Sequence, residues 1–302
     1  MLDFAPRPPA PAPALPVPAW AGVATCALPA TDLAAPRPAP QRLSHHLLML
    51  TTAGHGTVEI DFATQPCRPG TLLWARPGQA LRFGGQPGLD AAIIAFDPGL
   101  HSAGDIPGLN LDDAFGPIRW QLAGEDEDAV INEFTQLAVD CQRHSSGEVA
   151  AALLRHQLAV LLLRIALLDP DDPADPTWSE QRTFARFRRE LEHGHPDSRR
   201  VEDYAARLGC SVRTLTRASL AVTGRTAKQV VDDRVALEAR RLLACTPLSV
   251  AEVGRRLGFP EPTNFGRFFH REVGRSPGAF RSSVGHEGDA RIPMQRRPPD
   301  SA

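Results

Sequence analysis

The stretch from Val201 to Arg281 most constrains how this chain can fold, because it contains one helix–glycine–helix pattern twice. In the second copy, Ser249 precedes Glu252 by three residues, which is the spacing of a capping box at the start of a helix. Gly258 can adopt the left-handed conformation that ends this helix, and a second helix is predicted from Thr263 to Val273. This copy therefore predicts two short helices joined by a tight turn.

The first copy lies 49 residues earlier and follows the same order, with one helix ending at Gly209 and another predicted from Ser211 to Leu220. An amphipathic helix, predicted from Ala227 to Cys245, connects the two copies. Two helix-turn-helix units on one connecting helix predict an all-α domain. The second helix of each unit is the one that enters the major groove of double-stranded DNA.

These residues closely resemble the C-terminal DNA-binding domain of the AraC/XylS family of transcription regulators. The most diagnostic motifs are Leu257-Gly258-Phe259, Asn264-Phe265-Gly266-Arg267-Phe268-Phe269 and Gly274-Arg275-Ser276-Pro277-Gly278-Ala279-Phe280-Arg281. The strong part of the resemblance covers about a third of the chain. It implies a bacterial-type regulator that binds DNA, contacts RNA polymerase and works in the cytoplasm, associated with the nucleoid. Activation is the commoner outcome in the family, and repression is the other.

The exposed face of each second helix supplies the candidate DNA contacts. The candidates for contacts to bases or phosphates are Arg213, Thr214, Thr216 and Arg217 in the first unit and Thr263, Asn264 and Arg267 in the second, and Arg225 is the candidate for a phosphate contact. All but Thr214 and Arg225 are carried over from the family pattern. Arginine pairs bidentately with guanine, asparagine with adenine, and threonine offers a hydroxyl and a methyl group. An ordinary solvated helix face is the alternative.

Two positions in the first unit depart from the family pattern. Ser219 occurs where the family usually has an aromatic residue, and Arg200 occurs where the second unit has Ser249. We therefore expect the first unit to be less rigid than the second, or to be capped by Ser198.

The charge is divided unevenly along the chain. Residues 195–302 contain 19 Arg and Lys against 12 Asp and Glu, whereas residues 1–194 contain 14 against 23. A basic C-terminal part and an acidic N-terminal part suit a chain in which only one part faces phosphate groups.

The N-terminal half has a different pattern. Residues 1–40 contain eleven prolines, which predicts a largely mobile segment, with an edge strand over Val17–Leu28 as the alternative. Short apolar runs then predict strands over His45–Thr51, Thr57–Phe62, Thr71–Ala75, Ala80–Phe83 and Ala91–Phe96. Such strands predict a small antiparallel barrel or sandwich. The run from Pro69 to Gln79 is similar to one in the cupin-like sensor domains of the family, which implies an effector-binding barrel.

Two helices are predicted after the strands, over Asp126–His144 and Glu148–Leu168. The apolar stripe of the second is broader than one surface helix needs. We predict that it forms a homodimer contact, with burial inside one subunit as an alternative of equal weight. The residues of this predicted contact are Leu158, Leu161, Leu162 and Ile165. Polar residues interrupt the apolar run, so the helix is not predicted to span a membrane.

The predicted fold is α+β with two domains. A cupin-like antiparallel β-barrel with two helices occupies residues 41–168, and an acidic, proline-rich linker follows over residues 169–177. The all-α double helix-turn-helix domain occupies residues 178–285, and its first helix is predicted over Trp178–His193. Residues 286–302 are predicted to be a disordered tail.

His46 and Trp74 are the candidates for lining an effector pocket, although either could be ordinary core. His45, His46 and His55 also suggest a cupin-type metal site. Adjacent residues on a strand point to opposite faces, so His45 and His46 cannot bind one ion together. No carboxylate or further histidine stands at a suitable spacing. We therefore expect no metal, no cofactor and no catalytic residue.

These observations predict a sequence-specific, DNA-binding transcription regulator that responds to a small-molecule effector, with activation as its favoured outcome. Two alternatives fit the same sequence. One is a cupin-type enzyme with a DNA-binding appendage, and the other is an effector-independent DNA-binding protein whose barrel only dimerises.

Overall fold

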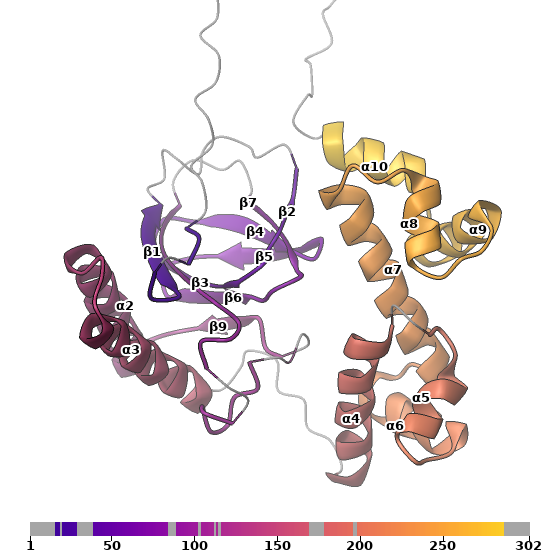
Figure 1. The fold of residues 1–302 in the computed structure, drawn as a ribbon, viewed down its shortest axis with the longest axis horizontal. Coiled ribbons are helices and arrows are strands. Elements are labelled where there is room, and N and C mark those ends of the chain that lie inside the picture. The colour runs from indigo at the N-terminus through magenta and orange to yellow at the C-terminus, as the bar shows by residue number, and fades with distance from the viewer. Residues whose placement is uncertain are drawn as a thin grey trace, which may run out of the picture.

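The computed structural model describes residues 16–18, 20–28, 39–83, 89–101, 104–111, 113, 116–168, 178–195 and 198–286. Figure 1 shows two domains, a β-structure flanked by two helices and a separate group of helices formed by the C-terminal part of the chain. The predicted α+β class and the two-domain arrangement are confirmed. The predicted linker at residues 169–177 lies outside the described residues, as do residues 287–302 of the predicted tail.

Two antiparallel sheets form the N-terminal domain. The five-stranded sheet contains, in spatial order, β1 (Val23–Leu28), β8 (Asp90–Phe96), β3 (His46–Ala53), β6 (Thr71–Ala75) and β9 (Arg119–Gln121). The four-stranded sheet contains β2 (Gln41–Arg42), β7 (Ala80–Phe83), β4 (Gly56–Ile60) and β5 (Ala63–Cys67). All five predicted strands are present within two residues of their predicted ends. The structure also contains β2, β5 and β9, which were not predicted. The edge strand that was an alternative over Val17–Leu28 is present as β1.

The five-stranded sheet is apolar on both faces, because alternate residues of its strands pack into different cores. Leu47, Met49 and Leu73 point toward the four-stranded sheet and join the core between the sheets. Leu48 and Trp74 point the other way, into a core that is shared with the two flanking helices. The continuous apolar runs in β3 and β6 therefore result from burial on two sides.

Strand β1 corrects the predicted domain boundary at residue 41. It pairs with β8 along its whole length, from Val23 opposite Phe96 to Leu28 opposite Ala91. The N-terminal domain thus includes residues that were assigned to a mobile segment over residues 1–40. Residues 1–15, 19 and 29–38 of that segment lie outside the described residues.

Helices α2 (Glu125–Arg143) and α3 (Glu148–Leu167) pack against each other, and α2 also packs against β1 and β8. The predicted dimer contact on α3 is wrong in its choice of residues. The side chains of Leu158, Leu161, Leu162 and Ile165 are 0–1% exposed in this single chain, because they fill the core between α3, α2 and the sheet. The stripe is intrachain core, which was the alternative of equal weight.

A second apolar stripe occupies the opposite face of α3. Its members follow helical spacing and together span about 80° around the helix axis. They are Val149, Leu153, Val160, Leu163 and Leu167, all exposed in this chain. By length and composition α3 could cross a membrane. Its other face, however, forms part of the core of this domain, which is the commoner reason for so apolar a helix.

Seven helices form the described part of the C-terminal domain. They are α4 (Trp178–Gly194), α5 (Val201–Arg207), α6 (Val212–Thr223), α7 (Ala227–Cys245), α8 (Val250–Arg256), α9 (Pro262–Val273) and α10 (Pro277–His286). The connecting helix α7 has the predicted bounds. It packs against helices of both helix-turn-helix units, which lie at its two ends in Figure 1.

The caps of these helices follow the sequence signals in the second unit. Both bonds of the predicted capping box are formed, since the Ser249 hydroxyl accepts from the Glu252 amide and the Glu252 carboxylate accepts from the Ser249 amide. In the first unit, Arg200 caps α5 without a side-chain hydrogen bond. The predicted capping role of Ser198 is wrong in detail. Its hydroxyl donates to the Asp203 carboxylate and accepts from the Arg200 amide, which precedes the helix.

Candidate DNA interface and effector pocket

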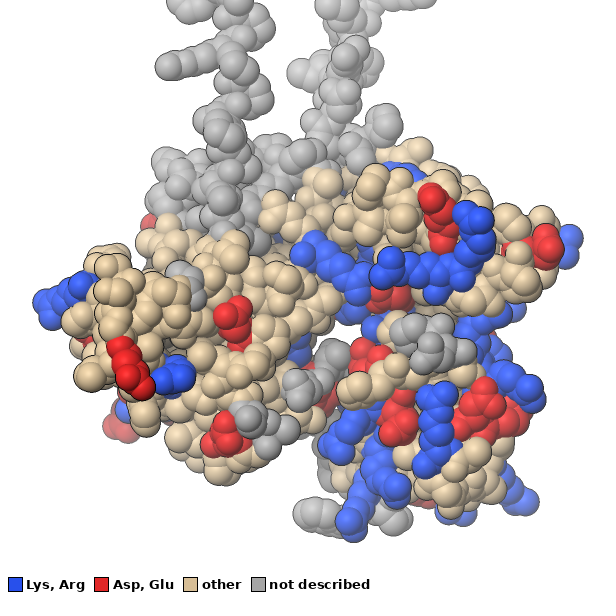
Figure 2. All heavy atoms as spheres, viewed as in Figure 1, with Lys and Arg blue, Asp and Glu red and all other residues tan. Residues whose placement is uncertain are grey.

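Helices α6 and α9 have one buried and one exposed face, as recognition helices require. Leu215 anchors α6, and Phe265, Phe268 and Phe269 anchor α9 in the core of the domain. Of the sequence-predicted DNA contacts, the exposed ones are Arg213, Arg217, Arg225, Thr263, Asn264 and Arg267, and Thr214 and Thr216 are half-buried. Figure 2 shows many Lys and Arg side chains over the C-terminal domain, while much of the visible barrel surface is uncharged.

Intrachain contacts distinguish these candidates. Arg217 lies 3.3 Å from Glu180 and Arg225 lies 3.1 Å from Asp233, so each would have to exchange an ion pair for a phosphate or a base. Within the described ranges, Arg213 and Arg267 make no ion pair. These two guanidinium groups are therefore the most available for direct contacts to a ligand.

Thr214 has a local structural role as well. Its amide donates to the Ser211 hydroxyl at 3.0 Å, which caps the N-terminus of α6, and the two hydroxyl groups lie 2.9 Å apart. A contact from Thr214 to a base would compete with this cap.

Close packing fixes the angle of α9 against α8. A Cβ atom on Gly254 would lie 3.1 Å from the Phe265 side chain, closer than an ordinary van der Waals contact, so a larger residue here would push the two helices apart or displace Phe265. Phe259 packs on Phe265 and Phe268, and the Arg199 guanidinium lies 3.7 Å from the centroid of the Phe259 ring. The diagnostic phenylalanines therefore hold the second recognition helix rigidly.

A hairpin of the barrel contacts helix α7, which the sequence did not reveal. The β4–β5 turn consists of Asp61 and Phe62, both with positive φ, 52° and 66°. Arg241 donates from Nε and Nη2 to the two oxygens of the Asp61 carboxylate, at 2.8 and 2.7 Å. Phe62 lies edge-on to Phe280 at 5.5 Å, and the Arg240 guanidinium lies 4.3 Å from the centroid of the Phe62 ring. We call this set of contacts the hairpin contact.

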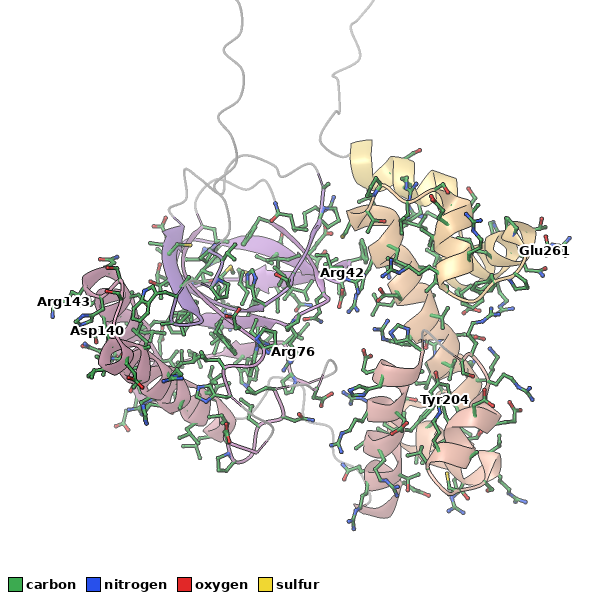
Figure 3. All side chains as sticks on the ribbon, in the orientation of Figure 1. Arg42, Arg76, Asp140, Arg143, Tyr204 and Glu261 are labelled. Carbon is green, nitrogen blue, oxygen red and sulfur yellow. The ribbon has the colours of Figure 1, made fainter. Side chains whose placement is uncertain are left out.

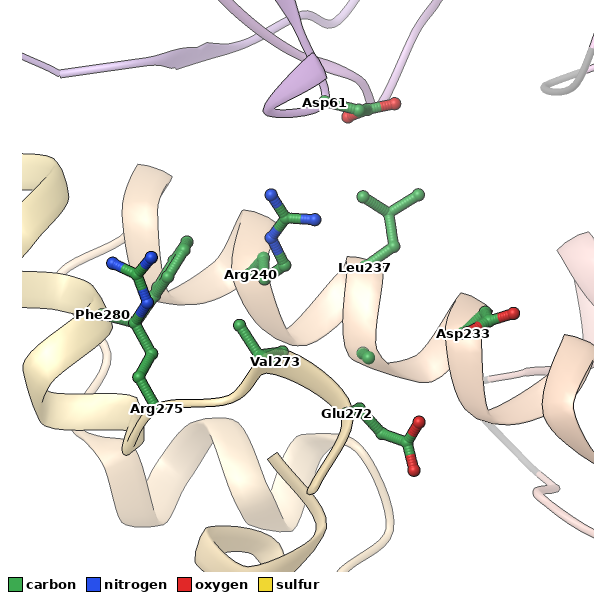
Figure 4. A pocket seen from close by; sticks show the side chains of 9 residues that line it. Asp61, Asp233, Leu237, Arg240, Glu272, Val273, Arg275 and Phe280 are labelled. Atoms are coloured by element: carbon green, nitrogen blue, oxygen red, sulfur yellow. The ribbon is translucent and has the colours of Figure 1, made fainter. Parts of the chain in front are cut away.

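Further ion pairs extend the hairpin contact along α7. Glu238 accepts from Arg241 and Arg234 and lies 2.7 Å from Arg42 of the barrel. Arg234 also pairs with Glu192 of α4, at 2.6 Å. Figure 4 shows the adjoining pocket of about 510 Å³, in which Asp61 lies on the barrel opposite Arg240 of α7. Charged groups thus connect the barrel to the helix that carries both helix-turn-helix units.

The two candidate effector residues lie together on the helix-facing side of the five-stranded sheet. The Trp74 indole donates from Nε1 to Nδ1 of His46 at 3.3 Å, and the His46 ring stacks on Phe96 at 4.6 Å. Burial, with the nearby charges of Arg76 and His45, lowers the pKa of His46 to about 3, so the ring is neutral at physiological pH. His46 lines a pocket of about 360 Å³ between the barrel and α4, whereas Trp74 is not one of its lining residues.

The histidines considered for a metal site do not gather around one point. Within the part of the chain that the structure describes, no group of three or more His, Cys, Asp and Glu side chains could hold a metal ion.

Two family models match the chain. A model of the AraC-like ligand binding domain matches residues 30–154, and a model of a helix-turn-helix domain matches residues 204–283. A sensor-type barrel joined to a double helix-turn-helix domain defines a class of ligand-responsive DNA-binding proteins. The chain belongs to the AraC/XylS family of transcription regulators.

Similar proteins include two curated regulators. The activator RhaR of Enterobacter sp. is 29% identical over 180 residues, which are 59% of this chain and 62% of that protein. The chain thus spans less than two thirds of this relative. The arabinose operon regulatory protein of Salmonella typhimurium is 25% identical over 249 residues, 80% of this chain and 85% of that protein.

Two solved structures are also similar. ToxT from Vibrio cholerae is 8% identical, with 87% of this chain and 98% of that chain covered and a TM-score of 0.42. The DNA-binding domain of AdpA, solved in complex with a target DNA, is 34% identical, with 35% of this chain and 94% of that chain covered and a TM-score of 0.32.

Proposed function

We propose that this chain is a sequence-specific, DNA-binding transcription regulator whose barrel binds a small-molecule effector. The observation that carries the proposal is the pair of anchored recognition helices, α6 and α9, with Arg213 and Arg267 exposed and unpaired within the described residues. Base contacts from these helices would supply sequence preference, and phosphate contacts from arginines would set the register. Relatives named as transcriptional activators favour activation, with RNA polymerase as the partner at the promoter.

Residues 178–286 alone are expected to bind DNA. This part of the chain has its own hydrophobic core, which includes Phe187, Tyr204 and Val235, and a positive charge balance. Binding should weaken steeply as the salt concentration rises, because the protein displaces counterions from the phosphates. DNA fragments selected by the full chain would be titrated with the fragment in a fluorescence anisotropy assay at several salt concentrations. A folded fragment that does not bind these fragments even at low salt would refute the proposal.

Replacing either Asn264 or Arg267 with alanine is expected to relax the preference at particular base pairs. The loss should be about 1–3 kcal/mol on the preferred base if the contact is bidentate. Arg225→Ala, if this residue contacts only phosphate, should weaken binding to all sequences alike and lower the dependence on salt. Binding would be measured on a library in which each base pair of the selected site is varied.

Arg164→Ala is the matched control for these substitutions. Arg164 is also a partly exposed arginine with an ion-pair partner, Glu133, but it lies on α3 of the other domain. This variant should bind like the unmodified chain. If Asn264→Ala, Arg267→Ala and Arg225→Ala all reduce binding uniformly, α9 does not read bases.

The effector would act by binding differently to the DNA-competent arrangement of the domains and to the incompetent one. The hairpin contact and the pocket beside His46 lie between the domains, so both can transmit such a difference.

We also propose that the chain forms a homodimer through the exposed stripe of α3, from Val149 to Leu167. Five apolar residues on one helix face, with spacings of four, seven, three and four residues, suit a helix–helix contact between two copies.

A further inference from the structure

The pocket beside His46 has walls from both domains. They are His46, Arg76 and Pro77 of the barrel, Pro98 and Leu111 of the segment between β8 and β9, and Glu192 and His193 of α4. Figure 3 labels Arg76 at the side of the barrel that faces the C-terminal domain. A volume of about 360 Å³ is close to the lower end of ligand sites, which are about 300–1,000 Å³. The pocket therefore suits a compact small molecule.

Arg76 is a buried cation without a carboxylate partner among the described residues. Its side chain donates from Nη1 and Nη2 to the carbonyl oxygens of Gly116 and Pro117, at 3.2 and 2.9 Å, and its guanidinium lies over the Trp74 ring. Only 3% of the residue is exposed, and its Nε–H has no acceptor within the described ranges. Asp113, the acidic group that acts on it electrostatically, is paired with Arg188 at 3.0 Å. A buried charge in this state gains from an anion in the pocket.

His46 supplies a second unpaired donor. An indole nitrogen can only donate, so Nδ1 of His46 accepts the bond from Trp74, and the proton of the neutral ring is on Nε2. That Nε2–H meets no acceptor in the part of the chain that the structure describes, and the residue is 1% exposed. The two residues that carry these buried donors line one pocket, and an unmet buried donor costs free energy. A ligand with acceptor oxygens would satisfy them.

The remaining residues that line the pocket indicate which groups the ligand carries besides its acceptor oxygens. Glu192 is held by two hydrogen bonds from Arg234, at 2.6 and 2.9 Å, so its negative charge is already balanced. Pro77, Pro98 and Leu111 offer apolar contact. We propose that this pocket binds a small organic carboxylate, whose oxygens accept hydrogen bonds from Arg76 and His46 and whose body packs on the two prolines and Leu111. The inference rests on the proposed function, because it names the chemical class of the effector.

The test uses the full chain without DNA, so its result does not depend on whether the C-terminal domain binds DNA. Phenylacetate and isovalerate would be titrated by calorimetry, with phenylacetamide and isovaleramide as neutral partners of the same shape. We expect at least one acid to bind at least tenfold more tightly than its amide. Inorganic phosphate serves as a further probe, and binding of phosphate without either acid would overturn the assignment of an organic carboxylate.

Arg76→Gln removes the charge and should reduce the affinity for the acid at least tenfold, to the level of the amide. Arg82→Gln is the matched control, because Arg82 lies on β7 of the same barrel, where it pairs with Glu59. Circular dichroism would establish that each variant is folded. If Arg76→Gln does not fold, the comparison of acids with amides on the unmodified chain decides the question. Equal binding of acid and amide, no binding of either acid at about 10 mM, or full affinity in folded Arg76→Gln would overturn the proposal.

Discussion

Asp61→Asn is expected to release the C-terminal domain from the barrel while both domains stay folded. The change removes the charge that Arg241 meets with two hydrogen bonds, and breaking a buried ion pair costs up to about 3–5 kcal/mol. Asparagine tolerates the positive φ of Asp61, so the turn itself should persist. Small-angle scattering should show a larger radius of gyration, and the segment between the domains should become more sensitive to protease.

Glu59→Gln is the control for this substitution. Glu59 lies on the same hairpin, but its ion-pair partner is Arg82 of the neighbouring strand, so the change breaks no ion pair between the barrel and α7. This variant should scatter like the unmodified chain. If Asp61→Asn leaves both scattering and proteolysis unchanged, the hairpin contact does not hold the domains together. A change in DNA affinity in Asp61→Asn alone would connect the contact to regulation.

Glutamate on the two opposite faces of α3 is expected to give two different defects. Leu161 is 0% exposed, so Leu161→Glu places a carboxylate in the core and should unfold the N-terminal domain, at a cost of several kcal/mol. Leu163 is 40% exposed in the single chain, so Leu163→Glu should leave the fold intact. If the exposed stripe holds two copies together, Leu163→Glu should yield folded monomers.

Sedimentation together with circular dichroism separates these outcomes. Folded Leu163→Glu monomers should also bind DNA more weakly, since two linked DNA-binding domains gain from effective concentration. Arg164→Ala, next to Leu163 but outside the stripe, is the control and should keep the native oligomeric state. A folded Leu163→Glu variant that stays dimeric would place the interface elsewhere on the chain. Native stability in Leu161→Glu would contradict the burial of this residue.

The parts of the fold that follow from sequence have strong local signals. Helix α7 has the predicted ends because its amphipathic stripe is long, and in the structure Thr226 forms a capping box with Gln229 at its start. Strand β6 has the predicted ends because its five residues are buried and a turn precedes and follows them. In such segments the local secondary-structure preference and the pattern of buried residues indicate the same element.

The missed strands lack these signals. Strand β5 is an edge strand with mostly exposed residues and with Pro66 inside it, so it shows no apolar alternation. Strand β9 has only three residues, and its partner strand β6 lies far away in the sequence, with Leu72 opposite Trp120. The choice of residues for the dimer contact was wrong for a related reason, because a helix that is apolar on two faces does not reveal which face its own domain covers.

Some residues of the candidate sites also follow from local sequence patterns, whereas others depend on contacts between distant parts of the chain. The exposed positions of α6 and α9 follow from helix periodicity, and their roles in DNA binding stay predictions. His46 was a candidate because of its place in the predicted barrel, whereas Arg76 was not singled out. Its importance depends on which carbonyl groups and rings surround it. The bond from Arg241 to Asp61 spans 180 positions in sequence, and no local pattern marks it.

Helix α7 also has a consequence for the geometry of the operator. Its 19 residues span about 28 Å at 1.5 Å per residue, somewhat less than the ~34 Å of one turn of DNA. Both recognition helices are attached to α7 in the same chain. The length of α7 therefore fixes the distance and the rotation between the two DNA segments that they would contact. Inserting a single residue into α7 would turn one unit by about 100° relative to the other. Within one subunit, the spacing of the contacted bases is thus a property of helix length, independent of how many copies assemble.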